Sequence, residues 1–221
     1  MKSQEALTAE EEKFFRSFTH PMEIQRYLDA LRYNDSYYWK SPRYVLRVGT
    51  ANCGEGAYLA AALLKFMGYK PLVVEMSVDN DDAHMLAVYK RNGCWGSIGK
   101  SNTTLLRSRE PVFQSIRELV MSYFEFYFNV QGYKTLRGFT QPVNVDDLKP
   151  EDWITTDVDL DPYFDQYTKM PYETILTEEM LRDLSPAEPI IMRACFLGAS
   201  KAGLYVPPGV TIDECLEKVD K

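Results

Sequence analysis

Apolar positions recur at helical spacing in the first part of the chain. Thr8 followed by Glu11 forms a capping box, which predicts a short helix running to about Phe18. The break at His20-Pro21 precedes a second amphipathic pattern, whose first turn tolerates the proline. Its apolar positions are Ile24, Tyr27, Leu28 and Leu31. The aromatic segment 33–47 loses this period, and we expect it to be loop-like.

The clearest helix begins near Asn52. Asn52 and Glu55 have capping-box spacing, and Gly68 followed by Pro71 ends the pattern. Cys53 falls in the first turn of this helix. Because several of its apolar residues are small, other backbone can approach closely, and we expect the helix to be central and buried. The apolar positions are Ala57, Ala60, Ala61, Leu64 and Met67.

Strand patterns follow this helix. Residues 71–76, 83–90 and 95–100 are short runs rich in apolar and β-branched residues, and we expect three strands. The acidic turn 79–82 separates the first two. This turn lacks the glycine and the distant glutamate of an EF-hand loop, so we interpret it as a solvated turn rather than a calcium site.

A hairpin signal sets the register of the second and third strands. Asn92-Gly93 is typical of a two-residue β-hairpin turn. A turn of two residues places His84 opposite Ser101. Gly99 then shares the face of His84, and Asn102 lies on the other face.

Later patterns are weaker. Ser115 has capping-box spacing and opens a helix that continues through Tyr127, with apolar residues on more than one face, so we expect it between two layers. After Tyr133 we expect, in order, a strand within 136–145, an acidic loop at 157–165, a helix at 177–184 and a strand at 190–196. The chain shows no internal repeat and no convincing linker.

Composition excludes several classes of protein. Of the 221 residues, 45% are hydrophobic, which is ample for a packed core, and the net charge is −7 with a sequence pI near 5.0. A nucleic-acid interface needs clustered Lys and Arg, so we expect no nucleic-acid partner. No apolar run is long enough to span a bilayer, and the N-terminus has no secretory h-region. We therefore expect no membrane partner and a cytoplasmic location.

The candidate chemistry depends on one cysteine and one histidine. The four cysteines show no CxxC or other metal-ligand spacing, so we expect neither a disulfide framework nor a metal site. Cys53 at a helix N-terminus is favourably placed for thiolate formation, whereas the other three are interpreted as structural. His20 precedes a proline in a helix-breaking turn, which leaves His84 as the candidate base. The alternatives are that Cys53 fills space beside Ala57 and that His84 is satisfied by a backbone carbonyl.

At these residues the order of elements resembles the transglutaminase-like superfamily. The papain-like core of that superfamily presents a cysteine at a helix N-terminus and a histidine and an acid on the following strands. Segments 108–113 and 122–124 are similar to a bacterial branch of it and imply no chemistry. A looser likeness, at 47–49 and 53–55, is to the related arylamine N-acetyltransferases. The main resemblance is carried by Asn52-Cys53-Gly54-Glu55-Gly56-Ala57, Asp82-Ala83-His84-Met85-Leu86-Ala87-Val88-Tyr89 and Trp95-Gly96-Ser97-Ile98-Gly99.

The resemblance implies an α+β fold in which the Cys53 helix packs on a small antiparallel sheet, with a helical N-terminal layer. It implies a single transglutaminase-like domain over 1–221, with its core at about 44–102, a helical part at 8–43 and a part of unassigned role at 103–221. The implied activity is that of a Cys-His amide hydrolase or acyl transferase without a cofactor. Its substrate would be a peptide, a protein or a small amide.

One position departs from the superfamily pattern. Counting from Trp95 places Gly99 where the catalytic Asp is expected, and glycine cannot orient a histidine. Ser101, opposite His84, or Asn102, if a bulge at Gly99 shifts the register, are the candidate orienting residues. The missing acid also supports a second hypothesis, a catalytically inactive papain-like module that binds peptide or protein in the same groove. The oligomeric state stays open.

Overall fold

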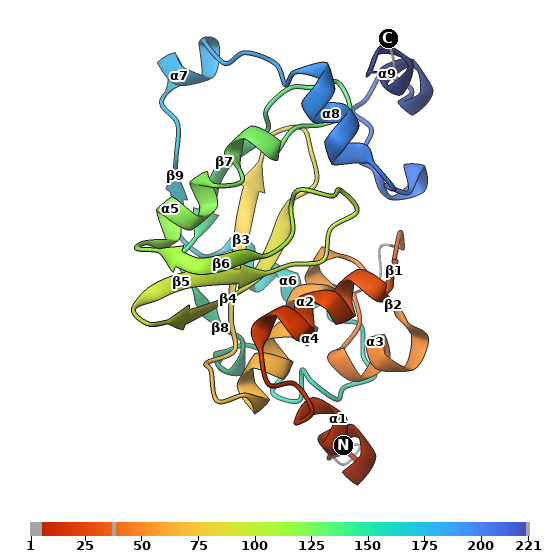
Figure 1. Ribbon diagram of the computed structural model, residues 1–221, viewed down its shortest axis with the longest axis vertical. Helices are drawn as coiled ribbons and strands as arrows, with labels where there is room; N and C mark the ends of the chain where they lie inside the picture. The colour runs from red at the N-terminus through yellow and green to blue at the C-terminus, as the bar shows by residue number, and fades with distance from the viewer. Residues whose placement is uncertain (1–5, 37–38, 220–221) are drawn as a thin grey trace.

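The computed structural model describes residues 6–36 and 39–219, which form an α+β fold (Figure 1). The helices are α1 (Ala9–Phe15), α2 (Pro21–Ala30), α3 (Pro42–Val48), α4 (Cys53–Phe66), α5 (Ile116–Met121), α6 (Asp161–Thr168), α7 (Glu178–Arg182), α8 (Pro189–Phe196) and α9 (Ile212–Val219). The strands are β1 (Arg32–Tyr33), β2 (Thr50–Ala51), β3 (Leu72–Val78), β4 (His84–Arg91), β5 (Cys94–Ile98), β6 (Arg109–Phe113), β7 (Leu136–Thr140), β8 (Val143–Asn144) and β9 (Tyr172–Thr174). Short 3₁₀ turns lie at Phe124–Phe126, Val145–Asp147 and Lys201–Gly203.

Within the described chain, seven strands form one antiparallel sheet. Its order is β6-β5-β4-β3-β7-β9, and β8 also pairs with β3, while β1 and β2 form a separate parallel ladder. The predicted hairpin is confirmed: Arg91 pairs with Cys94, and Asn92 and Gly93 both have positive φ, as a type I′ turn requires. The paired residues of β4 and β5 end at Ile98 on β5.

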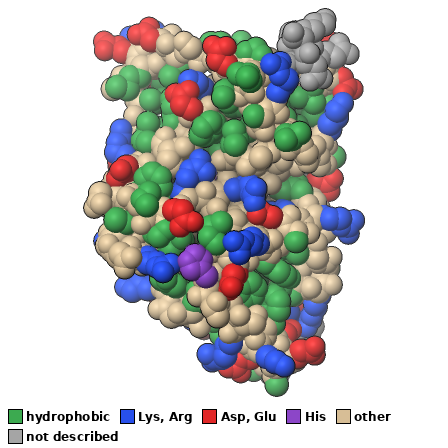
Figure 2. Space-filling model, viewed as in Figure 1, with side chains coloured by type: hydrophobic (Ala, Val, Ile, Leu, Met, Phe, Trp, Pro, Cys, Tyr) green, Lys and Arg blue, Asp and Glu red, His purple; other side chains and the backbone are tan. Residues whose placement is uncertain are grey.

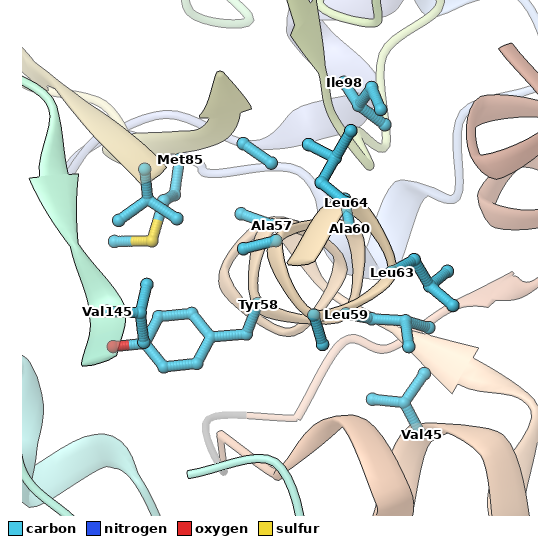
Figure 3. Close-up of a cluster of buried hydrophobic side chains, with 14 of the residues drawn as sticks. Val45, Ala57, Tyr58, Leu59, Ala60, Leu63, Leu64, Met85, Ile98 and Val145 are labelled. Atoms are coloured by element: carbon cyan, nitrogen blue, oxygen red, sulfur yellow. The ribbon is translucent and has the colours of Figure 1, made fainter. Parts of the chain in front are cut away.

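Hydrophobic layers cover both faces of the sheet. Side chains alternate along β4, so Met85 and Ala87 pack with α4 on one face, whereas Leu86 and Val88 pack with α5 on the other. The prediction that α4 is buried is confirmed, since its residues 54–64 are all shielded from solvent. Figure 3 shows apolar side chains of the sheet and of neighbouring helices around α4. The helix therefore cannot shift without disturbing the core.

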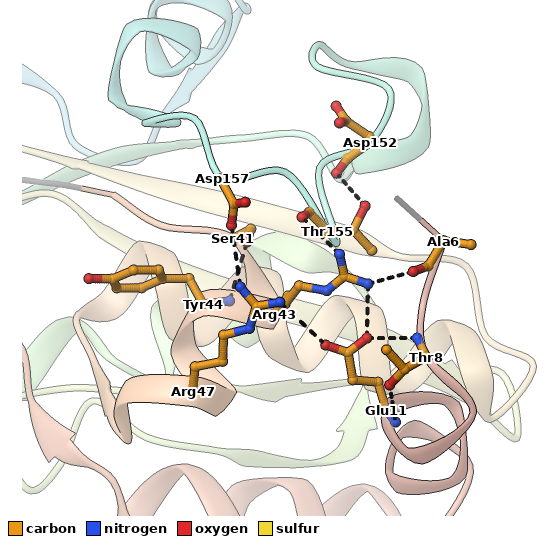
Figure 4. A network of polar contacts seen from close by, with 10 residues as sticks. All are labelled: Ala6, Thr8, Glu11, Ser41, Arg43, Tyr44, Arg47, Asp152, Thr155 and Asp157. Carbon is orange, nitrogen blue, oxygen red and sulfur yellow. Dashed lines mark hydrogen bonds and ion pairs between the residues drawn. The ribbon is translucent and has the colours of Figure 1, made fainter. Parts of the chain in front are cut away.

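Helices α1, α2 and α3 pack around α4 and belong to the same hydrophobic layer of the sheet as α4. Buried Arg43 joins this N-terminal part to the later chain. Its guanidinium donates to the carbonyl of Ala6 at 2.7 Å, to the carboxylate of Glu11 at 2.8 Å and to the carbonyl of Thr155 at 3.4 Å (Figure 4). The helical N-terminal part is thus fixed to the body of the molecule.

Segment 33–47, predicted to be loop-like, contains helix α3, and that prediction is wrong for its second half. The side chain of Ser41 caps the helix by accepting from the Tyr44 amide at 3.3 Å, and Pro42 occupies the first turn. Gly49 ends the helix with φ 71°. The start and stop signals were present, but the aromatic residues between them lack a clear helical period.

Segment 190–196, predicted to be a strand, is helix α8. An apolar run of this length fits either a strand or a helix. Two features favour the helix: Pro189 occupies its first turn, and Met192 and Cys195 are buried on one side of it. The helix predicted from Ser115 through Tyr127 ends at Met121 and is followed by a 3₁₀ turn.

Three further differences concern elements around the sheet. Strand β6 was not predicted, because Pro111 weakens a strand pattern and is tolerated here at a sheet edge. Helix α6 takes up part of the expected acidic loop 157–165. The strand predicted within 136–145 is present as β7 and β8, and the helix predicted at 177–184 is present as α7.

The first and last helices lie at opposite ends of the molecule. Helix α1 lies at one end of the longest axis and helices α8 and α9 lie at the other (Figure 1). On the face shown in Figure 2, Lys and Arg side chains lie scattered among acidic and hydrophobic ones. None of the helices in the described part of the chain has both the length and the apolar character of a membrane span.

Candidate active site at the start of helix α4

A cavity of about 650 Å³ opens at the N-terminal end of α4. Its walls include the starts of α4 and β4, the loop after β5, residues 126–130 and the C-terminal segment 202–206. The four residues that the sequence singled out, Cys53, His84, Ser101 and Asn102, all line it. The fold therefore brings residues that are far apart in sequence into one cavity.

Cys53 is the first residue of α4. Asn52 caps this helix by accepting from the Glu55 amide at 2.9 Å, and the Glu55 carboxylate accepts from the Asn52 amide at 2.9 Å. The predicted capping box is thus confirmed. Cys53 as a residue is partly exposed, and its thiol donates to the carbonyl of Ala83 at 3.7 Å. The sulfur lies beside the backbone that leads into β4.

The surroundings of Cys53 favour the neutral thiol. Burial, with a smaller contribution from the negative charge of Asp82, raises the pKa of the thiol to about 11. The backbone amides of Met85, Gly54 and Cys53 itself act in the opposite direction, because they donate to the sulfur. The expectation that the helix start would by itself favour a thiolate is not met, since burial outweighs these donors.

His84 opens β4 and is only 5% exposed. Its Nε2 lies 3.0 Å from the carbonyl oxygen of Leu106. Because a carbonyl oxygen only accepts, the proton is assigned to Nε2 and the lone pair to Nδ1. Burial lowers the pKa of the imidazole to about 4, and the Leu106 carbonyl opposes this only in part. The ring is therefore neutral at neutral pH, which is the protonation state of a general base.

Cys53 lies against the backbone at the start of β4, on either side of His84. The sulfur contacts backbone groups of Ala83 and Met85, the two neighbours of His84 in the chain. Among the contacts of residues 6–36 and 39–219, no hydrogen bond joins the sulfur to the His84 ring. The thiol must turn away from the Ala83 carbonyl to reach the imidazole.

Gly99 lies against His84, where the resemblance places an acid. A Cβ at Gly99 would be 2.6 Å from Cδ2 of Leu86, 3.4 Å from Nε2 of His84 and 3.5 Å from the Leu106 carbonyl oxygen. A side chain at this position would require Leu86 to shift, and the Leu106 carbonyl meets the imidazole instead. Gln25 of α2 holds Gly99 by accepting from its amide at 3.1 Å and donating to its carbonyl at 2.9 Å.

Ser101 and Asn102 hydrogen-bond away from His84. The Ser101 hydroxyl pairs with that of Thr103 at 2.9 Å and accepts from the Thr103 amide at 3.0 Å. The Asn102 side chain donates to the carbonyl of Ser200 at 2.8 Å and accepts from its amide at 2.9 Å. Strand β5 ends before both residues, so the predicted register does not extend to them. They line the cavity without orienting the imidazole.

Two groups contact the His84 ring, and the sequence identified neither of the residues that supply them. The Tyr127 ring meets the His84 ring edge to face with centroids 6.4 Å apart, and its hydroxyl donates to the Asp82 carbonyl at 2.7 Å. The second group is the carbonyl of Leu106, which agrees with the alternative that a backbone carbonyl satisfies His84. The sequence does not indicate which residue supplies this carbonyl, and it placed Tyr127 in a predicted helix rather than against His84.

The acidic turn before β4 faces the cavity rather than solvent alone. Asp81 and Asp82 both line the cavity, and burial raises the pKa of Asp81 to about 6 although Thr135 donates to its carboxylate at 2.6 Å. No group of three or more His, Cys, Asp or Glu side chains suited to a metal ion occurs in the part of the chain that the structure describes.

No protein-family model matches the chain, and a search of curated proteins also finds no match.

Proposed function

We propose that this protein is an acyl transferase or amide hydrolase in which Cys53 is the nucleophile and His84 the general base. The proposal is carried by the protonation state of His84: its Nε2–H donates to the Leu106 carbonyl, which leaves the lone pair on Nδ1 to accept a proton. The thiol that would supply this proton lines the same cavity. A neutral imidazole with a free lone pair can accept the thiol proton as the sulfur attacks, which is general-base catalysis.

In the acylation step, the Cys53 sulfur attacks the carbonyl carbon of the substrate and its proton moves to Nδ1 of His84. The carbonyl becomes a tetrahedral oxyanion. His84 then returns the proton to the leaving amine or alcohol as the bond to the acyl carbon breaks, which leaves a thioester on Cys53. Water or an amine attacks the thioester and loses its proton to His84. The bond between the acyl carbon and the sulfur then breaks, and His84 returns the proton to the sulfur, which restores the free thiol and releases the acid or the new amide.

Amides at the start of α4 support the oxyanion. The amides of Cys53 and Gly54 face the sulfur and stabilise negative charge on it. The same donors are placed for the adjacent oxygen of a tetrahedral intermediate, where a single donor typically contributes about a hundredfold or more in rate. The N-terminal end of the α4 dipole adds to this effect.

The cavity suits a substrate of modest size. Its volume of about 650 Å³ is typical of small-molecule and peptide side-chain sites, and Tyr33, Trp39 and Phe128 contribute aromatic walls. A peptide, a protein segment or a small amide fits this description. A thiol nucleophile at a helix start, followed by a histidine on an antiparallel strand, also supports placing the chain in the transglutaminase-like superfamily with papain-like topology.

An activated ester tests the proposal. With p-nitrophenyl acetate, we expect one acetyl group on Cys53, detected by intact mass and peptide mapping, and no acetyl group in Cys53→Ala. Cys94→Ala is the matched control, because Cys94 is a free and partly exposed cysteine in the β4–β5 hairpin. His84→Gln should slow acylation by about a hundredfold. Acetylation spread over several cysteines, or unaffected by His84→Gln, would contradict the assignment.

The second candidate function is a non-catalytic module that binds peptide or protein in the same cavity. It is favoured by the Sγ–H bond of Cys53 to the Ala83 carbonyl rather than to the imidazole. On this hypothesis wild type and Cys53→Ala would bind a peptide ligand equally well, and neither would form a thioester. The acetylation experiment therefore separates the two functions.

A further inference from the structure

The loop that carries the Leu106 carbonyl lies between β5 and β6. It has no regular secondary structure. A carbonyl in such a loop can orient a catalytic imidazole only if the loop is held in place, because a displacement of about 1 Å can cost about a hundredfold in rate. The carbonyls on either side of Leu106, those of Leu105 and Arg107, are each fixed by a side chain from outside the loop.

Arg109 fixes the first of these carbonyls. Both terminal nitrogens of its guanidinium donate to the Leu105 carbonyl at 3.3 Å. The same group donates to the hydroxyl of Ser122 at 3.0 Å and to its carbonyl at 3.2 Å. The guanidinium carbon also lies 3.9 Å from the ring centroid of Tyr123, within stacking distance. Arg109 therefore ties the loop to the end of α5.

Tyr123 fixes the second carbonyl. Its side chain is fully buried, and its hydroxyl donates to the Arg107 carbonyl at 2.6 Å. The same hydroxyl accepts from the hydroxyl of Ser97 at 2.7 Å, and the Ser97 oxygen accepts from the Arg109 amide at 3.1 Å. The Arg107 carbonyl can only accept, so the Tyr123 hydroxyl gives its single proton to that carbonyl and must accept from Ser97. The direction of these hydrogen bonds is therefore determined.

We propose that Arg109 and Tyr123 are positioning residues, which hold the Leu106 carbonyl against Nε2 of His84 and so perform the orienting task of the missing acid. The Leu106 carbonyl belongs to one peptide group, and the peptide groups directly before and after it are anchored through the Leu105 and Arg107 carbonyls. This anchoring prevents the Leu106 carbonyl from rotating away from the imidazole. Gly99 supplies the space that this arrangement needs. The catalytic meaning of this inference rests on the proposed function of His84, whereas the positioning itself can be measured on the resting protein.

The test observes the Nε2 proton directly. The chain contains two histidines, so a protein labelled with ¹⁵N-histidine gives a simple spectrum in which partly exposed His20 is the internal reference. In wild type we expect the His84 Nε2 proton to exchange slowly with water. In Tyr123→Phe and Arg109→Lys this exchange should be at least about tenfold faster. Acylation of Cys53 by p-nitrophenyl acetate should fall by about tenfold or more through its maximal rate, with KM unchanged.

Tyr58→Phe is the matched control. It removes the hydroxyl of another buried tyrosine, which pairs with the Tyr167 hydroxyl at 2.9 Å, on the α4 side of the sheet. This variant should keep wild-type exchange at His84. Circular dichroism checks that each variant folds, and the Arg109→Lys variant carries the test alone if Tyr123→Phe does not fold.

Two outcomes separate the inference from the function on which it rests. Wild-type exchange and wild-type acylation in folded Tyr123→Phe and Arg109→Lys would overturn the positioning role. Failure of the wild-type protein to form a thioester would instead refute the proposed function, while the exchange rates would still decide whether Arg109 and Tyr123 hold the carbonyl.

Discussion

The resting thiol of Cys53 should be a poor target for alkylation at neutral pH. Iodoacetamide reacts with the thiolate, and burial raises the pKa of Cys53 to about 11. At about pH 7 the thiolate fraction is therefore about one in ten thousand, whereas an unperturbed thiol with a pKa of about 8.5 is about 3% ionised. The difference in thiolate concentration is about three hundredfold.

Nucleophilicity offsets part of this difference. A thiolate of higher pKa is intrinsically more reactive, with a Brønsted coefficient of about 0.4–0.5, which recovers roughly tenfold over this interval of pKa. We therefore expect alkylation of Cys53 at about pH 7 to be roughly thirtyfold slower than that of a free cysteine in a model peptide. Asp82→Asn should raise the rate, because the negative charge of Asp82 opposes the thiolate. Asp79→Asn, in the same turn but outside the cavity lining, is the control.

The rate is measured by intact mass at several pH values. With a thiol pKa of about 11, the logarithm of the rate should rise with unit slope through about pH 9. His84→Gln should leave alkylation near the wild-type rate although it slows acylation, because a neutral imidazole does not stabilise the resting thiolate. A plateau of the rate near neutral pH, or its loss in His84→Gln, would show a thiolate–imidazolium pair and refute the reasoning.

Three further predictions concern stability and are read from urea unfolding. Arg43→Ala should lower the free energy of unfolding by about 3 kcal/mol, because it breaks a buried ion pair. Arg47→Ala, at an arginine side chain that is 53% exposed, should change it by less than about 0.5 kcal/mol. Equal effects of the two substitutions would contradict this prediction. Gly99→Ala should lower the free energy of unfolding by about 1–3 kcal/mol, because the new Cβ would lie 2.6 Å from Cδ2 of Leu86. An unchanged urea midpoint would contradict this, because it would show that the Leu86 side chain moves aside without loss of stability. The pKa of His84 is about 4 in the folded protein, so the unfolded chain takes up the proton first, and wild type should lose about 3 kcal/mol relative to His84→Gln as the pH drops from about 6.5 to about 4. The comparison with His84→Gln cancels the contribution of Asp81, whose raised pKa acts in the opposite direction over the same pH range. Equal pH dependence in the two proteins would contradict the assignment.

Several helix starts and one turn follow from local rules in the sequence. The capping boxes of Thr8 and Asn52 and the Asn92-Gly93 turn all form as predicted, because each depends on residues within a few positions of one another. The element order that juxtaposes Cys53 and His84 could also be predicted. Helix α3 and strand β6 could not, since aromatic residues and Pro111 obscure their periods. Helix α8 was mistaken for a strand because an apolar run of its length suits both structures.

The residue whose carbonyl orients His84 could not be predicted from the sequence, for a physical reason. Register arguments extend only as far as strand pairing, and β5 leaves the sheet before the residues that the register placed opposite His84. The partner that replaces them is the carbonyl of Leu106, and every residue has a carbonyl. What distinguishes this carbonyl is its support by Arg109 of β6 and by Tyr123, which follows α5 on the face of the sheet that bears His84. A missing acid in a sequence motif is therefore not sufficient ground for calling such a site inactive, because a held backbone group can meet the same ring nitrogen.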